Sequence, residues 1–184
     1  MSEAQTKTGK IICAVRTQED FNLALASKGE VIFDLSPDVM TLQERAKRAH
    51  VAKKRLFIHI DLASGIGKDK SGILYAKSCG VDGIISTRVN MIKTARELGL
   101  FTVQRFFIVD SQSIYTTVDA VRSAKPDMIE IMPALLYKTL SRLSHELSTP
   151  IIAGGLIESE DELNTAIYSG AVSVSTGKRE LWEK

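Results

Sequence analysis

The chain has 184 residues, of which 44% are apolar and 25% charged, and its formal net charge is +2. These values are typical of one globular domain with its own core, and so small a charge does not by itself predict a nucleic-acid-binding protein. The polar start lacks the apolar stretch of a secretion signal, and no apolar run approaches the ~18 residues that would span a membrane. The two cysteines, Cys13 and Cys79, are far apart in sequence, so we expect reduced thiols in a cytoplasmic protein.

Short apolar segments alternate along the chain with segments of helical pattern, and they begin about 23 residues apart. The predicted strands are residues 11–15, 31–36, 56–61, 83–86, 101–109, 128–133, 150–157 and 171–176. Ser159 with Glu162 three residues later forms a capping-box pattern that predicts a helix start. Strands that are apolar on both faces predict a parallel sheet covered by helices.

Eight strand–helix units are the number that closes a barrel. We therefore predict an α/β fold, a compact TIM-like (β/α)8 barrel with short loops, as a single domain over residues 11–184 after a flexible N-terminal segment, residues 1–10. An open doubly wound sheet is the alternative, but its glycine fingerprint is missing after the first strand, where Arg16 follows instead. The loops must be short because such barrels usually have about 200–400 residues.

The ends of the last two predicted strands suggest a phosphate site. In (β/α)8 barrels a phosphate commonly binds at the loops after strands seven and eight. Small residues there expose backbone N–H groups, and a short helix beginning near Lys178 would add its positive N-terminal end. The residues that we assign to a phosphate are Gly154, Gly155, Ser175, Thr176 and Gly177. The alternative is that these glycines only make the turns that close the barrel.

Charged and polar side chains also interrupt the apolar strands, where they are costly unless paired or bound to a ligand. They are Asp34, His59, Asp61, Arg105 and Glu130. His59 and Asp61 are two residues apart and should share one strand face, while Arg105 either serves the same pocket or pairs with Glu130. A pocket for a small polyol, acid–base groups and an internal ion network all remain open. Motifs such as HxH or HExxH are absent, so we expect no metal and no cofactor.

Two further segments have functional interpretations. The run "RAKRAHVAKKR", residues 45–55, contains six cations and no acid, and these are Arg45, Lys47, Arg48, Lys53, Lys54 and Arg55. It is either a solvated helix face or a surface for RNA phosphates away from the phosphate site. The glycine-rich loop 61–72 is either a flexible connection or a flap over the ligand, and it lacks the spacing of a P-loop.

Five long stretches resemble the glycerol uptake operon antiterminator proteins. They are "FIHIDLASGIGKDKSG", "GIISTRVNMIKTARELGLFTVQRFFIVDS", "PDMIEIMPALLYK", "PIIAGGLIES" and "AVSVSTGKRELW", and the resemblance runs from about Ile11 to Trp182. It implies a barrel-type regulator that responds to glycerol 3-phosphate. It also implies binding to the leader mRNA of glycerol-catabolism operons, which prevents premature termination of transcription. The glycine loops would then hold the phosphate, and the polar strand residues would face the glycerol part.

Two other classes of function remain open. A sugar-phosphate-binding barrel enzyme, an isomerase, aldolase or hydrolase, would use Asp61, His59 and Glu130. A structural protein with an empty pocket is the third interpretation. We expect no membrane partner, and association into a homo-oligomer is a default expectation only.

Overall fold

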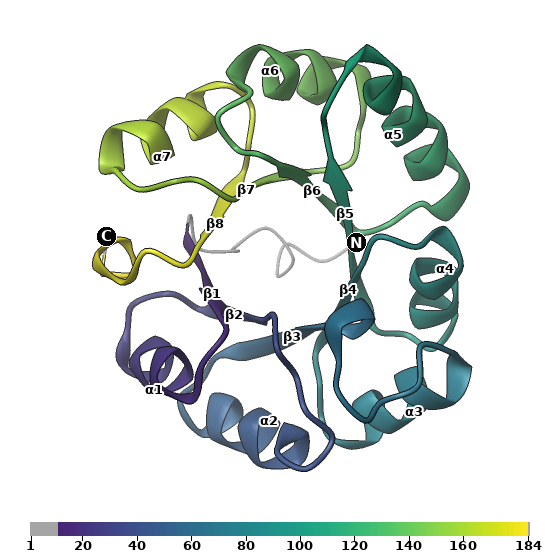
Figure 1. Cartoon of the computed structure of the whole chain (residues 1–184), viewed down its shortest axis with the longest axis vertical. Helices are drawn as coiled ribbons and strands as arrows, with labels where there is room; N and C mark the ends of the chain where they lie inside the picture. The colour runs from purple at the N-terminus through teal and green to yellow at the C-terminus, as the bar shows by residue number, and fades with distance from the viewer. Residues whose placement is uncertain (1–10, 184) are drawn as a thin grey trace.

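The computed structural model describes residues 11–183 and shows one closed (β/α)8 barrel (Figure 1). The segment predicted for residues 1–10 lies outside the described residues. The strands are β1 (Ile11–Val15), β2 (Val31–Asp34), β3 (Arg55–His59), β4 (Gly83–Ser86), β5 (Phe101–Phe107), β6 (Met128–Met132), β7 (Ile151–Gly154) and β8 (Ser173–Thr176). The helices are α1 (Gln18–Ala26), α2 (Leu42–Val51), α3 (Lys70–Ser78), α4 (Val89–Glu97), α5 (Ser111–Ala124), α6 (Tyr137–Glu146) and α7 (Glu160–Tyr168), with 3₁₀ turns η2 (Ile60–Leu62) and η3 (Arg179–Leu181).

The strands form a ring in chain order, and each is parallel to its two neighbours. β8 pairs with β1, where Ile11 lies opposite Val174 and Cys13 opposite Thr176, and this pairing closes the ring. The α-helices surround the ring on its outside (Figure 1). The arrangement confirms the predicted fold, and all eight predicted strands are present.

Four of the described α-helices, α1, α3, α5 and α7, begin at an N-cap side chain that accepts a hydrogen bond from a backbone N–H of the first turn. Ser159 and Glu162 form the predicted capping box at the start of α7, and Thr17 with Asp20 forms another at α1. None of the helices within residues 11–183 is both long and apolar enough to cross a membrane.

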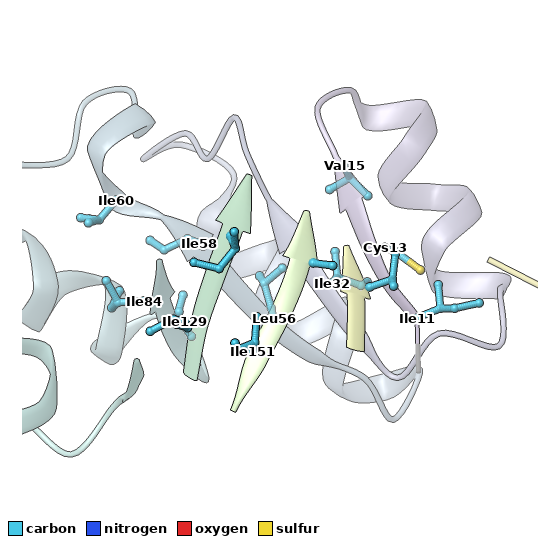
Figure 2. Close-up of a cluster of buried hydrophobic side chains, with 14 of the residues drawn as sticks. Ile11, Cys13, Val15, Ile32, Leu56, Ile58, Ile60, Ile84, Ile129 and Ile151 are labelled. Carbon is cyan, nitrogen blue, oxygen red and sulfur yellow. The ribbon is translucent and has the colours of Figure 1, made fainter. Parts of the chain in front are cut away.

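Alternate residues of each strand enter two different apolar layers. Phe33, Phe57 and Val103 belong to the cluster inside the barrel. The neighbouring positions on the strands, such as Ile32 and Ile58, belong to the larger cluster that includes buried helix residues, part of which is shown in Figure 2. The position of a polar residue along its strand therefore decides whether it lies inside the barrel or under the helices.

The turn η3 fastens the end of β8 to the first helix. Trp182 is fully buried, and its Nε1 donates to the carbonyl oxygen of Thr176 at 2.8 Å. Arg179 reaches α1, where it donates to Glu19 and Asp20, each at 2.8 Å. The turn η3 is therefore bonded both to the last residue of β8 and to α1.

Candidate functional site

A cavity of about 360 Å³ opens at the carboxyl ends of the strands. Its walls come mainly from the ends of β1, β5, β6, β7 and β8 and the loops that follow them. This volume lies within the range of small-molecule sites, about 300–1,000 Å³. The position is the face at which (β/α)8 barrels bind their ligands.

Four of the five residues predicted for a phosphate line this cavity, namely Gly155, Ser175, Thr176 and Gly177. Gly155 has a φ of +76°, a left-handed conformation that glycine adopts without strain. Gly177 has no such requirement, and a Cβ placed on it would meet nothing closer than the carbonyl oxygen of Ala14 at 3.6 Å. The glycine at position 177 is therefore not demanded by backbone strain or by a clash.

The fifth residue, Gly154, is not among the lining residues and has a different role. A Cβ at this position would overlap the carboxylate of Glu130, whose Oε1 fills the space that the missing side chain leaves. Gly154 thus allows an internal carboxylate to approach the backbone of β7. The space that we expected a phosphate to occupy at Gly154 is therefore filled by the Glu130 side chain.

Thr176 joins the two loops at this end of the cavity. Its Oγ1 donates to the carbonyl oxygen of Ile157 at 2.9 Å and accepts from the backbone N–H of Lys178 at 3.0 Å. The helix expected near Lys178 is only the three-residue turn η3, and so short an element has little macrodipole. The electrostatic contribution that we expected from a helix N-terminus is therefore largely missing.

Two cations that were not in the predicted set line the cavity beside the glycine loops, Arg16 and Lys178. Arg16 directly follows β1 and is exposed. The Nζ of Lys178 lies 3.9 Å from Oε2 of Glu180. Because β8 closes onto β1, these two positions come to the same side of the ring. The signal in the sequence was their place as the first basic residues after strands one and eight.

Arg105 and Glu130 form an ion pair inside the barrel, and both line the cavity. The Nε of Arg105 donates to Oε2 of Glu130 at 2.6 Å. The two residues lie opposite each other on neighbouring strands β5 and β6. The structure therefore combines the two roles that the sequence left open for Arg105, a pocket residue and a partner of Glu130.

His59 lies inside the barrel but is not among the residues that line the cavity. Burial, and secondly the nearby charge of Arg105, lower its pKa to about 4, although Asp61 opposes the shift. Its Nδ1 is buried and finds no hydrogen-bond partner among the described residues. The imidazole is therefore neutral near pH 7.

Asp61 does not share a strand face with His59, contrary to our expectation. β3 ends at His59 and the chain turns into η2, so the Asp61 side chain leaves the strand. Its carboxylate accepts from Ser86 Oγ and from the N–H of Thr87, each at 2.8 Å, and it is not among the cavity residues. Of the three residues that an enzyme was expected to use, only Glu130 reaches the cavity.

Asp34 lies on the opposite side of the barrel wall from the cavity. It shares a strand face with Ile32, under the helices, and its Oδ2 accepts from Arg45 Nη1 at 2.6 Å. The guanidinium of Arg45 also lies 5.0 Å from the ring centre of Phe21. Asp34 is therefore a partner for α2, and the structure gives it no place in the ligand pocket.

The basic run 45–55 is only partly at the surface. Arg45 is buried in the ion pair, and Lys54 is buried with its Nζ donating to the carbonyl oxygens of Ser27, at 2.7 Å, and Gly29. These two cations do not reach an external phosphate. Of the other cations of the run, Lys47 and Lys53 are exposed, and Arg48 and Arg55 are partly buried.

The loop 61–72 is tied to its surroundings and supplies no wall of the cavity. The backbone N–H of Ser64 donates to the carbonyl oxygen of Pro37 at 2.8 Å. Lys68 donates to the carbonyl oxygens of Ala63 and, at 3.3 Å, Ile66.

No cluster of three or more potential metal ligands occurs within residues 11–183.

Sequence comparison matches this chain to a defined family. The family model described as "Glycerol-3-phosphate responsive antiterminator" matches residues 11–182. The uncharacterized protein YgcP of Escherichia coli K12 is 36% identical over 173 residues, which cover 94% of this chain and 91% of that protein.

Solved structures with the same fold include two described as antiterminator or antiterminator-related proteins. The glycerol uptake operon antiterminator regulatory protein of Listeria monocytogenes matches with a TM-score of 0.91 and 32% identity over 97% of both chains. The related protein of Thermotoga maritima matches with a TM-score of 0.86 and 26% identity over 95% of this chain and 98% of that one. A deoxyribose phosphate aldolase of Aeropyrum pernix, with a TM-score of 0.72 and 14% identity over 95% and 88% of the two chains, shares the fold alone.

Proposed function

Because the chain belongs to the glycerol-3-phosphate responsive antiterminator family, we propose that it is a transcription antiterminator controlled by glycerol 3-phosphate. In this proposal it binds the leader mRNA of a glycerol-catabolism operon in the cytoplasm and prevents premature termination. Glycerol 3-phosphate acts as an effector that changes the affinity for RNA.

One observation carries the ligand assignment: the cavity has two chemically different ends. Small residues, the cations Arg16 and Lys178 and one exposed carboxylate, Glu158, surround the β1, β7 and β8 end. Its two cations outnumber the single carboxylate, which favours a phosphate there. Arg105 and Glu130 stand at the β5 and β6 end and suit hydroxyl groups. A small molecule with a phosphate and adjacent hydroxyls matches both ends.

A gel-shift titration of a glycerol-operon leader RNA, with and without glycerol 3-phosphate, tests the regulator directly. An effector shifts a conformational equilibrium only if it binds the two states unequally, so RNA affinity must change when it is added. We expect tighter RNA binding in its presence. Equal affinity with and without the effector, in a protein that calorimetry shows to bind glycerol 3-phosphate, would contradict the proposal.

We place the RNA surface on the exposed cations of the basic run, and we predict its salt dependence. Each phosphate contact contributes a slope of roughly 0.7 to 0.9 to the fall of log affinity with log salt concentration. Replacing Lys47 and Lys53 by Glu should therefore weaken RNA binding and lower that slope by about 1.4 to 1.8. Filter-binding titrations at several salt concentrations measure it.

The matched control makes the same charge change near the opposite ends of the barrel strands, with Lys70 and Lys138, both exposed, replaced by Glu. The control should retain the slope of the unmodified protein. If the control loses the slope and the first variant keeps it, the RNA lies on the face of the ligand cavity.

The enzyme interpretation has weaker support because Asp61, His59 and Glu130 do not converge on one point of the cavity. Incubation of the purified protein with glycerol 3-phosphate and related phosphate esters distinguishes the two classes. Turnover at a rate above that of a Glu130→Gln variant would favour an enzyme.

A further inference from the structure

The carboxylate of Glu130 is held in one place by two neighbours. Arg105 Nε donates to Oε2 at 2.6 Å, and Oε1 lies in the space that Gly154 leaves open on β7. A side chain of any size at position 154 would displace it. This fixed position matters because Glu130 is also one of the side chains that line the ligand cavity.

The carboxylate of Glu130 can accept hydrogen bonds but cannot donate them. A carboxylate paired with a guanidinium has oxygen lone pairs but no proton to donate, so it accepts hydrogen bonds and donates none. Glu130 is nearly completely buried, with 1% of its surface exposed, and a buried charge must be matched by donors. A ligand atom beside it is therefore favoured if it carries a proton and disfavoured if it carries only lone pairs.

The cations at the other end set the direction in which a ligand lies. Arg16 and Lys178 follow β1 and β8, whereas Glu130 stands on β6 with its carboxylate against Gly154 of β7. A phosphate at the cationic end is kept away from the carboxylate, which would repel it. The part of the ligand that reaches Glu130 is then the carbon chain next to the phosphate ester.

Resting on the proposed function, we propose that Glu130 is the specificity-determining residue of this cavity and that it distinguishes a hydroxyl from a keto group beside the phosphate-bearing carbon. Glycerol 3-phosphate has a hydroxyl there and donates to the carboxylate. Dihydroxyacetone phosphate has a carbonyl oxygen there and places lone pairs against lone pairs. The protein thus binds the reduced three-carbon phosphate more tightly than its oxidised counterpart.

The first test needs no substitution. Calorimetric titration of the unmodified protein with glycerol 3-phosphate, dihydroxyacetone phosphate and inorganic phosphate gives three affinities. We expect dihydroxyacetone phosphate to bind about 10- to 100-fold more weakly than glycerol 3-phosphate, since its carbonyl oxygen gives the buried carboxylate no hydrogen bond beyond the one from Arg105. A difference of less than about tenfold overturns the inference, because the hydrogen bond from the ligand hydroxyl to Glu130 would then contribute little to the affinity.

The second test assigns the discrimination to one residue. A Glu130→Gln variant offers both an amide N–H and a carbonyl oxygen, so it can pair with either ligand. The ratio of the two affinities should fall to within about threefold of unity. The matched control is Glu158→Gln, at an exposed carboxylate that lines the same cavity. It removes the same charge and should leave the ratio unchanged.

The two kinds of failure are distinguishable. Absence of glycerol 3-phosphate binding to the unmodified protein overturns the proposed function. Binding of both phosphates with equal affinity, or a ratio that Glu130→Gln leaves intact, overturns only the role of Glu130. If the variant does not fold, the titration of the unmodified protein still decides the hydroxyl preference.

Discussion

Two ion pairs in this barrel are almost identical in their local chemistry but lie on opposite sides of its wall. Arg105–Glu130 and Arg45–Asp34 both have N–O distances of 2.6 Å. The side chains are 4% exposed for Arg105 and 1% for Glu130, and 10% for Arg45 and 0% for Asp34. The first pair borders a cavity, whereas the second is enclosed between β2, α2 and the ring of Phe21. Burial and pairing alone therefore do not identify a ligand-binding residue.

The difference arises from the strand face on which each carboxylate stands. Glu130 follows Met128 of the inner cluster by two positions, while Asp34 follows Ile32 of the outer cluster by two. The inner pair meets a space that another molecule can enter. The outer pair meets only side chains of the protein, so we expect it to act on stability alone. Three predictions, from the largest expected effect to the smallest, examine this contrast.

Breaking the outer pair should give the largest effect. Asp34→Asn leaves the buried guanidinium of Arg45 without its counter-charge, and such a loss typically costs about 3–5 kcal/mol of the free energy of unfolding. Urea denaturation measures this cost. The affinity of the folded protein for glycerol 3-phosphate should stay the same.

An exposed carboxylate on the outside of the barrel provides the comparison. Asp119→Asn on α5 should change the free energy of unfolding by less than about 0.5 kcal/mol. The proposed difference between the two pairs is wrong if Asp34→Asn changes the free energy of unfolding as little as Asp119→Asn does. It is also wrong if Asp34→Asn lowers the affinity for the ligand.

Inside the barrel, His59, which is buried near Arg105 of the inner pair, should make the free energy of unfolding depend on pH. Burial and Arg105 lower the pKa of this histidine from 6.5 to about 4, so between these pH values the unfolded state binds more protons than the folded state. The free energy of unfolding should therefore fall by an amount on the order of 3 kcal/mol as pH decreases from 6.5 to 4. Above pH 6.5 the histidine contributes no slope.

Denaturant titrations between pH 4 and 7 measure this contribution as a difference between variants. His59→Gln should remove it, whereas His145→Gln, at an exposed histidine on α6, should retain the full slope. Identical slopes in the two variants would show that His59 is not the group that resists protonation.

A change in the cavity that touches neither pair should affect binding with little effect on stability. Gly177→Val adds a side chain to a lining residue whose backbone is not left-handed and whose Cβ position is open. We expect the affinity for glycerol 3-phosphate to fall at least about tenfold, or 1.4 kcal/mol. The free energy of unfolding should change by less than about 1 kcal/mol.

Gly155→Val serves as the contrasting variant, because its φ of +76° and the Met132 methyl group 2.7 Å from an added Cβ strain the folded state. That variant should lose stability as well as affinity. Retained ligand affinity in Gly177→Val would remove the β8 loop from the phosphate site.

The strands and their order could be predicted because short apolar segments alternate regularly with helical patterns, some of which carry capping signals such as Ser159 with Glu162. The inward or outward direction of Asp34 could not, since both faces of its strand are apolar and the usual two-residue alternation is missing. Asp61 was misplaced for another reason: β3 ends at His59, and a 3₁₀ turn then redirects the chain. Arg16 was missed because the phosphate rule for these barrels points to the loops after strands seven and eight, although closure of the ring brings β1 beside β8.

Closure of the ring between β8 and β1 has a consequence for synthesis of the protein. Arg16 is translated early and Gly177 more than 150 residues later, yet both border the same cavity. A nascent chain that has not yet left the ribosome as far as Thr176 therefore has no complete cavity. Under the proposed function, a partially translated copy therefore does not respond to glycerol 3-phosphate.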